Sequence, residues 1–167
     1  MHPSFHPLFV DYCTYFNGNQ DYFECHEVLE EYWKIEAPGN KEHALVGFVQ
    51  LATAMYHWRR GNEQGAYRVL NKSLTLLKKN AKSPFFDYLD MQALYEDIEL
   101  AIQNIHSGQT FISFKIQITN AHLLEVVTQK IKDLTPHDLA YLIDKHKLRD
   151  RSAIIAEREA NKRSRRH

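Results

Sequence analysis

The strongest constraint on the fold is a series of apolar stripes at helical spacing, each ended by glycine or proline. In residues 21–36 the apolar positions share one helix face. They are Tyr22, Cys25, Val28, Leu29 and Tyr32. Comparable stripes occupy about 7–17, 42–60, 64–81 and 90–106. Breakers such as Gly18, Pro38, Gly61 and Gly108 follow them, and the pattern therefore predicts five helices and an all-α fold.

Short breaks between these stripes predict that successive helices run antiparallel. A weak internal sequence similarity supports this arrangement, since a Gly-Asn pair precedes a predicted helix at both Gly18 and Gly61. We therefore expect residues 1–108 to form a compact bundle domain of antiparallel helical hairpins. No apolar run approaches the ~20 residues of a membrane-spanning helix, and the first residues do not resemble a signal segment. Cytoplasmic localisation is the default expectation.

Residues 109–167 form a second region, a mostly helical extension. Apolar and polar residues alternate over 111–118 (FISFKIQI), which is typical of a half-buried strand that faces inward through Ile112, Phe114, Ile116 and Ile118. A lone strand is poorly stabilised, so the segment would pair with another chain, lie as an arm across its own bundle, or not be a strand. Helices are expected at 120–133, at 136–147 with Thr135 as cap, and at 150–164.

Charge is unevenly distributed, although 21 basic and 21 acidic residues balance overall. The last nineteen residues hold seven bases and three acids, so the rest of the chain is acidic. Such a tail could bind nucleic acid or an acidic partner, although a solvated helix end is the simpler interpretation. The bases that would make these contacts include Arg149, Arg151, Lys162, Arg163, Arg165 and Arg166.

The most distinctive polar pattern is the stretch HEVLEEYW, which begins at His26. His26 and Glu30 are four residues apart and share one helix face, with Trp33 on the same line. The stretch begins like the zincin motif H-E-x-x-H, but Glu30 replaces the second histidine and excludes that class. The pattern therefore predicts that His26 and Glu30 form a half-buried polar pair beside aromatic residues.

A second polar face is predicted on the following helix, where Gln50, Thr53 and His57 recur at helical spacing. An antiparallel pairing places Glu30 opposite Gln50, and His26 opposite Thr53 or His57. His26, Glu30 and His57 could then hold a divalent metal, or the cluster with Gln50 could orient a water for acid–base chemistry. The alternative is a polar network that only ties two helices together.

These residues resemble a known family. Phe16-Asn17-Gly18, His26-Glu27-x-x-Glu30-x-x-Trp33, Gly47-x-x-Gln50 and His57-x-x-x-Gly61-Asn62 are similar to motifs of the bacterial domain-of-unknown-function family numbered three hundred and nine. The resemblance covers about residues 7–80 and, more loosely, 85–106. It implies a small all-α bundle in which His26, Glu30, Trp33, Gln50 and His57 occupy motif positions. It supplies no substrate, cofactor or mechanism.

Two functions from different classes follow from this pattern. The first is a metal-binding or hydrolase-like site formed by His26, Glu30, Gln50 and His57. The second is a non-enzymatic interaction module in which those residues are structural and the helical surface or the tail recruits a partner. A homodimer is also expected, because an unpaired strand edge at 111–118 would pair with a second copy of itself.

Overall fold

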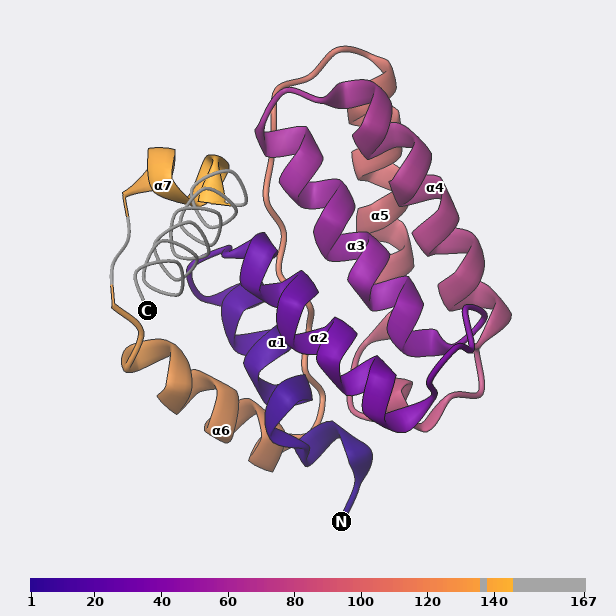
Figure 1. Cartoon of the computed structure of the whole chain (residues 1–167), viewed down its shortest axis with the longest axis vertical. Coiled ribbons are helices and arrows are strands. Elements are labelled where there is room, and N and C mark those ends of the chain that lie inside the picture. The colour runs from indigo at the N-terminus through magenta and orange to yellow at the C-terminus, as the bar shows by residue number, and fades with distance from the viewer. Residues whose placement is uncertain (136–137, 146–167) are drawn as a thin grey trace, which may run out of the picture. The chain divides into compact units, whose positions relative to one another are not determined.

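The computed structural model describes residues 1–135 and 138–145 of the chain (Figure 1). The chain divides into two compact units, Met1–Pro136 and His137–His167. The first unit therefore extends beyond the expected boundary at residue 108 and includes residues 109–135. The expected helix at 150–164 and the basic tail lie outside the described residues.

Every regular element among the described residues is helical, which confirms the all-α prediction. Unit 1 contains α1 (Pro7–Asn17), α2 (Tyr22–Glu36), α3 (Ala44–Arg59), α4 (Glu63–Lys79), α5 (Met91–His106) and α6 (Ala121–Lys132). Short 3-10 turns at Pro3–Phe5 and Pro84–Phe86 precede α1 and α5. The first five helices follow the predicted ranges to within three residues, because Asp21, Asn62 and Asp90 cap α2, α4 and α5 with side-chain oxygens.

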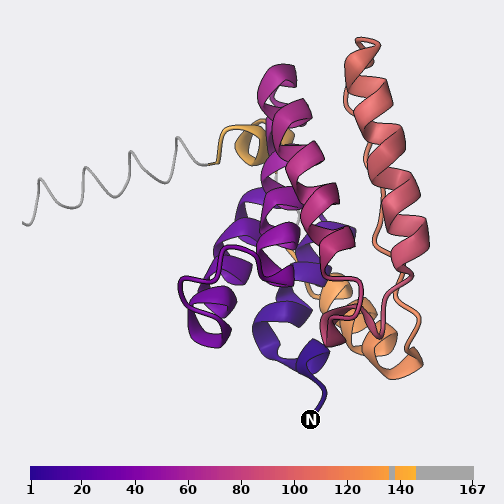
Figure 2. The ribbon, with the colours of Figure 1, turned by 90° about the vertical axis from the view of Figure 1, so that its right-hand side faces the viewer.

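α3 is the central helix, packed between α2 and α4, while α1 packs on α2 (Figure 2). α4 approaches α3 closely at Gly47, where an added Cβ would lie 2.7 Å from a methyl carbon of Leu77. The Ser73 hydroxyl of α4 donates to the Gly47 carbonyl at 2.7 Å in the same contact. α5 packs on α4, and α6 packs on α1. The result is a bundle in which consecutive helices from α1 to α4 are neighbours.

Residues 109–118 form an extended arm and not the predicted strand, since only an isolated bridge joins Ile118 to Leu89 in the described chain. The Asn17 side chain provides the partners that a second strand would have supplied. It donates to the Ile116 carbonyl and accepts from the Ile116 amide, both at 2.8 Å. Ile116 is buried, whereas Ile112, expected to face inward, is 52% exposed. Phe111 packs on Trp58 in its place.

The described part of unit 2 contains one short helix, α7 (Leu139–Ile143). Its cap is Asp138, whose carboxylate accepts from the Ala140 amide at 2.8 Å, and not the expected Thr135. The predicted helix at 136–147 is therefore shorter than its pattern indicated. The arm's contacts occur within a single chain, and the homodimer stays a prediction.

Candidate functional site

A half-buried stripe of α3 separates two hollows in the surface of unit 1. The stripe consists of Val46, Val49, Gln50, Thr53 and His57, while most other residues of α3 are buried. α2 flanks one side of α3, where Phe23 and Tyr56 lie 6.1 Å apart between ring centroids. This contact agrees with the predicted antiparallel register. We refer to the stripe and its two flanking hollows as the α3 groove.

The α2–α3 hollow has a volume of about 180 Å³. Its lining residues are His26, Glu30, Trp33, Lys41, Val46 and Val49. Three of these residues were expected at the site. Trp33 forms part of its wall and also donates from Nε1 to the Asn40 carbonyl at 2.9 Å, which ties α2 to the loop before α3.

His26 lies between two carboxylates of α2. Its Nε2 is 3.4 Å from Glu30 and its Nδ1 is 3.5 Å from Glu27. The other Glu30 oxygen is 3.2 Å from Lys34 Nζ. The His26 and Glu30 side chains are 34% and 35% exposed, so solvent screens these contacts. The pair is therefore half-exposed, and it lies at the surface of the helix pair and not in its core.

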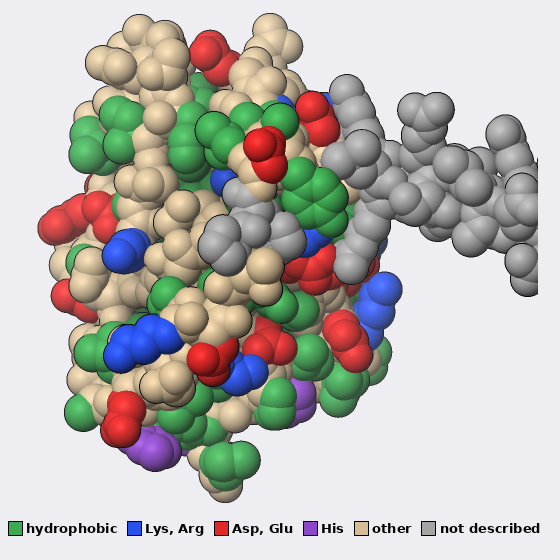
Figure 3. Space-filling view, turned by 90° about the vertical axis from the view of Figure 1, so that its left-hand side faces the viewer, with side chains coloured by type: hydrophobic (Ala, Val, Ile, Leu, Met, Phe, Trp, Pro, Cys, Tyr) green, Lys and Arg blue, Asp and Glu red, His purple; other side chains and the backbone are tan. Residues whose placement is uncertain are grey.

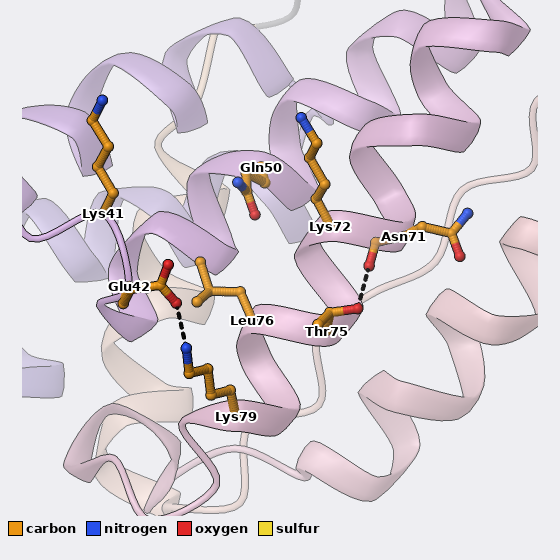
Figure 4. Close-up of a pocket in the computed structure, with 8 residues that line it drawn as sticks. All are labelled: Lys41, Glu42, Gln50, Asn71, Lys72, Thr75, Leu76 and Lys79. Atoms are coloured by element: carbon orange, nitrogen blue, oxygen red, sulfur yellow. Dashed lines mark hydrogen bonds and ion pairs between the residues drawn. The ribbon is translucent and has the colours of Figure 1, made fainter.

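The α3–α4 hollow has a volume of about 400 Å³ and lies on the other side of the stripe (Figure 4). Its lining residues are Lys41, Glu42, Gln50, Asn71, Lys72, Thr75, Leu76 and Lys79. Lys41 also lines the α2–α3 hollow, so the two hollows meet at the loop that precedes α3. Glu42 and Lys79 form an ion pair of 2.7 Å across the end of the hollow.

Gln50 lies on the α3–α4 side of the stripe and not in the hollow that contains Glu30, its expected partner. Its Oε1 atom is buried and has no hydrogen-bond partner among the described residues. Such an oxygen is unusual in a folded protein, because a buried acceptor without a donor costs about 1–3 kcal/mol. The Gln50 side chain lines the hollow, and a change of its rotamer would turn this oxygen toward a bound molecule.

His57 does not join His26 and Glu30. Its Nδ1 accepts from the side-chain amide of Asn62 at 3.2 Å, near the end of α3 opposite to the Lys41 loop. Among the described residues, no group of three or more His, Cys, Asp or Glu side chains is arranged to hold a metal ion. The metal set of His26, Glu30 and His57 is therefore not assembled, because the histidines lie at different positions along the helix pair.

The two cysteines, Cys13 and Cys25, are buried in the core. Burial raises the pKa of the Cys13 thiol to about 12, and it also raises the pKa of Cys25. Both thiols therefore stay protonated near neutral pH and do not supply a nucleophile. No helix in the described ranges is long and apolar enough to cross a bilayer.

Sequence reasoning missed the basic residues of the α3–α4 hollow. Lys41 lies in a loop, and Lys72 and Lys79 are on α4, distant from the His26 pattern in the chain. One signal could have identified them. Arg68, Lys72, Thr75 and Lys79 recur at helical spacing and mark a polar, mostly basic edge of α4 beside its apolar stripe.

Comparison with known proteins places the chain in a family of unknown function. A family model described as Domain of unknown function (DUF309) matches residues 9–69, a range that includes α2, α3 and both histidines of the expected site. The chain is 38% identical over 158 residues to Uncharacterized protein YpuF of Bacillus subtilis (strain 168), covering 90% of this chain and 91% of that protein. No solved structure matches the chain. The identity extends over almost the whole length of both proteins, and the chain therefore belongs to the DUF309 family.

Proposed function

We propose that the chain is a cytoplasmic, non-catalytic interaction module that binds a polypeptide segment of another protein in the α3 groove. The observation that carries the proposal is the buried, unpartnered Oε1 of Gln50. A side-chain amide can accept from a backbone N–H and donate to a backbone carbonyl, which are the groups that an extended peptide presents. Gln50 thus offers a peptide backbone an acceptor oxygen that the described residues of its own fold leave unpaired.

The shape and lining of the groove support the same proposal. Val46 and Val49 provide half-buried apolar surface beside Gln50, and the two hollows on either side can receive side chains. Binding sites of this kind combine apolar area with a few polar groups that fix the orientation of the ligand. The volumes of about 180 and 400 Å³ are on the scale of amino-acid side chains and short peptide segments.

Hydrolase-like chemistry is the second candidate, and the position of His26 between Glu27 and Glu30 favours it. A histidine beside carboxylates can act as a general base toward a molecule in the α2–α3 hollow. The His26→Ala variant separates the two functions. It would remove catalysis, but it would leave intact peptide binding that depends on Val49 and Gln50.

Selection of random displayed peptides on the full-length protein tests the interaction module. Peptides that bind the wild type should lose at least tenfold in affinity to Val49→Arg, which places a bulky charge on the groove floor. Leu100→Arg is the matched control, because Leu100 is 55% exposed on α5 and does not line the groove. Fluorescence anisotropy measures the affinities, and unfolding curves verify that both variants fold. The proposal is wrong if no peptide is selected, or if the two variants bind equally well.

A further inference from the structure

The α3–α4 hollow carries positive charge that the surrounding protein does not neutralise. It contains three lysines and one acidic residue. Glu42 pairs with Lys79, while neither Lys41 nor Lys72 forms an ion pair with another residue of the described chain. Figure 4 shows Lys41 and Lys72 on either side of Gln50, with both amino groups projecting in the same direction. The hollow therefore presents two unpaired cations around an amide.

This charge continues along the edge of α4. Arg68 is exposed and lies one helical turn before Lys72, so the two residues share a face of the helix. The described side chains on the face of the molecule in Figure 3 are different, because acidic, basic and hydrophobic groups are intermixed there. Lys41, Lys72 and Arg68 form what we term the basic edge of the groove.

We infer that the basic edge binds acidic side chains, and that the ligand of the α3 groove is an acidic polypeptide segment. The inference rests on the proposed function and adds the chemical class of the partner. Aspartate or glutamate side chains of the segment would pair with Lys41 and Lys72 while its backbone bonds to Gln50. Complementary charge of this kind accelerates association and selects the partner more than it adds raw affinity.

An acidic surface adjoins the α2 side of the groove, because Glu30 lines both the α2–α3 hollow and a second concavity on α2. An open concavity on α2 is lined by Glu24, Glu27, Val28, Glu30, Glu31 and Lys34. Its excess of carboxylates repels acidic side chains, so those of a bound segment are confined to the α4 side. The acidic surface beside α2 and the basic edge together favour a segment whose acidic residues lie on the α4 side, through repulsion near one and attraction at the other.

The same asymmetry favours a polypeptide over a nucleic acid. A nucleic acid carries a negative charge at every phosphate, and a strand along the groove would bring some phosphates close to the α2 carboxylates. A polypeptide can place its acidic residues only where the lysines are. Leu76, which is 8% exposed, also gives the hollow an aliphatic contact that suits a side chain better than a phosphate.

The test uses the same random-peptide selection, made in parallel on the wild type and on Lys72→Glu. Peptides selected on the wild type should be enriched in aspartate and glutamate, and those selected on Lys72→Glu should not. A selected peptide should bind at least tenfold more weakly to Lys72→Glu, but within about threefold of wild type to Lys72→Arg. Lys115→Glu is the matched control, since Lys115 is an exposed lysine of the arm outside the groove. Replacing the aspartates and glutamates of the peptide by asparagine and glutamine should weaken its binding to the wild type by a factor similar to that of Lys72→Glu.

Each other outcome has a definite meaning. If the selected peptides lack acidic residues and Lys72→Glu binds them normally, the acidic partner is wrong while the interaction module stands. If no peptide is selected, both proposals fail. If a labelled oligothymidylate binds as tightly as the selected peptides and with the same loss in Lys72→Glu, the basic edge is a general polyanion site and the polypeptide inference is overturned.

Discussion

The two sides of α3 differ in how completely their side chains are buried and hydrogen-bonded. On the buried side, Phe48, Leu51 and Met55 are fully enclosed, and the polar groups that reach them are satisfied: the Tyr12 hydroxyl donates to the Phe48 carbonyl at 2.8 Å. On the groove side, residues are half-exposed and the Gln50 Oε1 has no partner. This difference is the basis of our proposal that the groove side binds a ligand.

The largest expected effect comes from truncating neighbouring residues on the two sides. Phe48→Ala should lower the free energy of unfolding by about 3–5 kcal/mol, because it leaves a cavity among packed aromatic rings. Val49→Ala should lower it by about 1 kcal/mol or less, because its side chain already contacts solvent. Denaturant unfolding of both variants measures the difference. A loss from Val49→Ala as large as that from Phe48→Ala would show that the groove side is part of the core.

A smaller effect is expected at the His26–Glu30 pair. His26→Ala and Glu30→Ala should each change the free energy of unfolding by less than about 1 kcal/mol, because solvent-exposed ion pairs contribute little. Denaturant unfolding at neutral pH measures both changes. A loss of about 1–3 kcal/mol from either variant would instead identify a structural network, as expected when a buried polar partner is left unpaired.

Local patterns predicted most of the helical bundle. The apolar stripe and the Asp21 cap located α2, and the Asp90 cap located the start of α5, because these signals involve residues within a turn of each other. The alternation over 111–118 left a paired strand and an extended arm both open, because the choice between them depends on residues distant in the chain. A strand needs a distant partner, and the sequence could not show that Asn17, on α1, takes this role for Ile116.

The site was predicted in part. His26, Glu30 and Trp33 were found because they share a helix face within one short stretch, and the structure places all three in the α2–α3 hollow. Gln50 was identified as a site residue but assigned the wrong neighbours. Lys41 and Lys72 were missed, since only the packing of α4 against α3 brings a loop lysine and a helix lysine to the same hollow.

The smallest expected effect concerns pH, at the residue where α3 begins. His43 caps α3, and its Nδ1 accepts from the Leu45 amide at 3.1 Å. Desolvation lowers the pKa of His43 below its ordinary value of 6.5, against a weaker opposing effect of Glu36. The unfolded chain therefore binds this proton more readily than the folded protein does. The contribution of His43 to stability is complete above pH 6.5 and is lost as the pH falls through the lowered pKa.

Replacing His43 by asparagine isolates this contribution. Asparagine also caps helices well, but it does not titrate, so His43→Asn keeps an acceptor for Leu45 and removes the proton. The free energy of unfolding should decline less in the variant than in the wild type between pH 7 and pH 5, because all other histidines are common to both. Equal declines would mean that His43 is protonated as easily in the folded protein as in the unfolded chain. In that case the His43 side chain at the start of α3 would be as well solvated in the folded protein as in the unfolded chain.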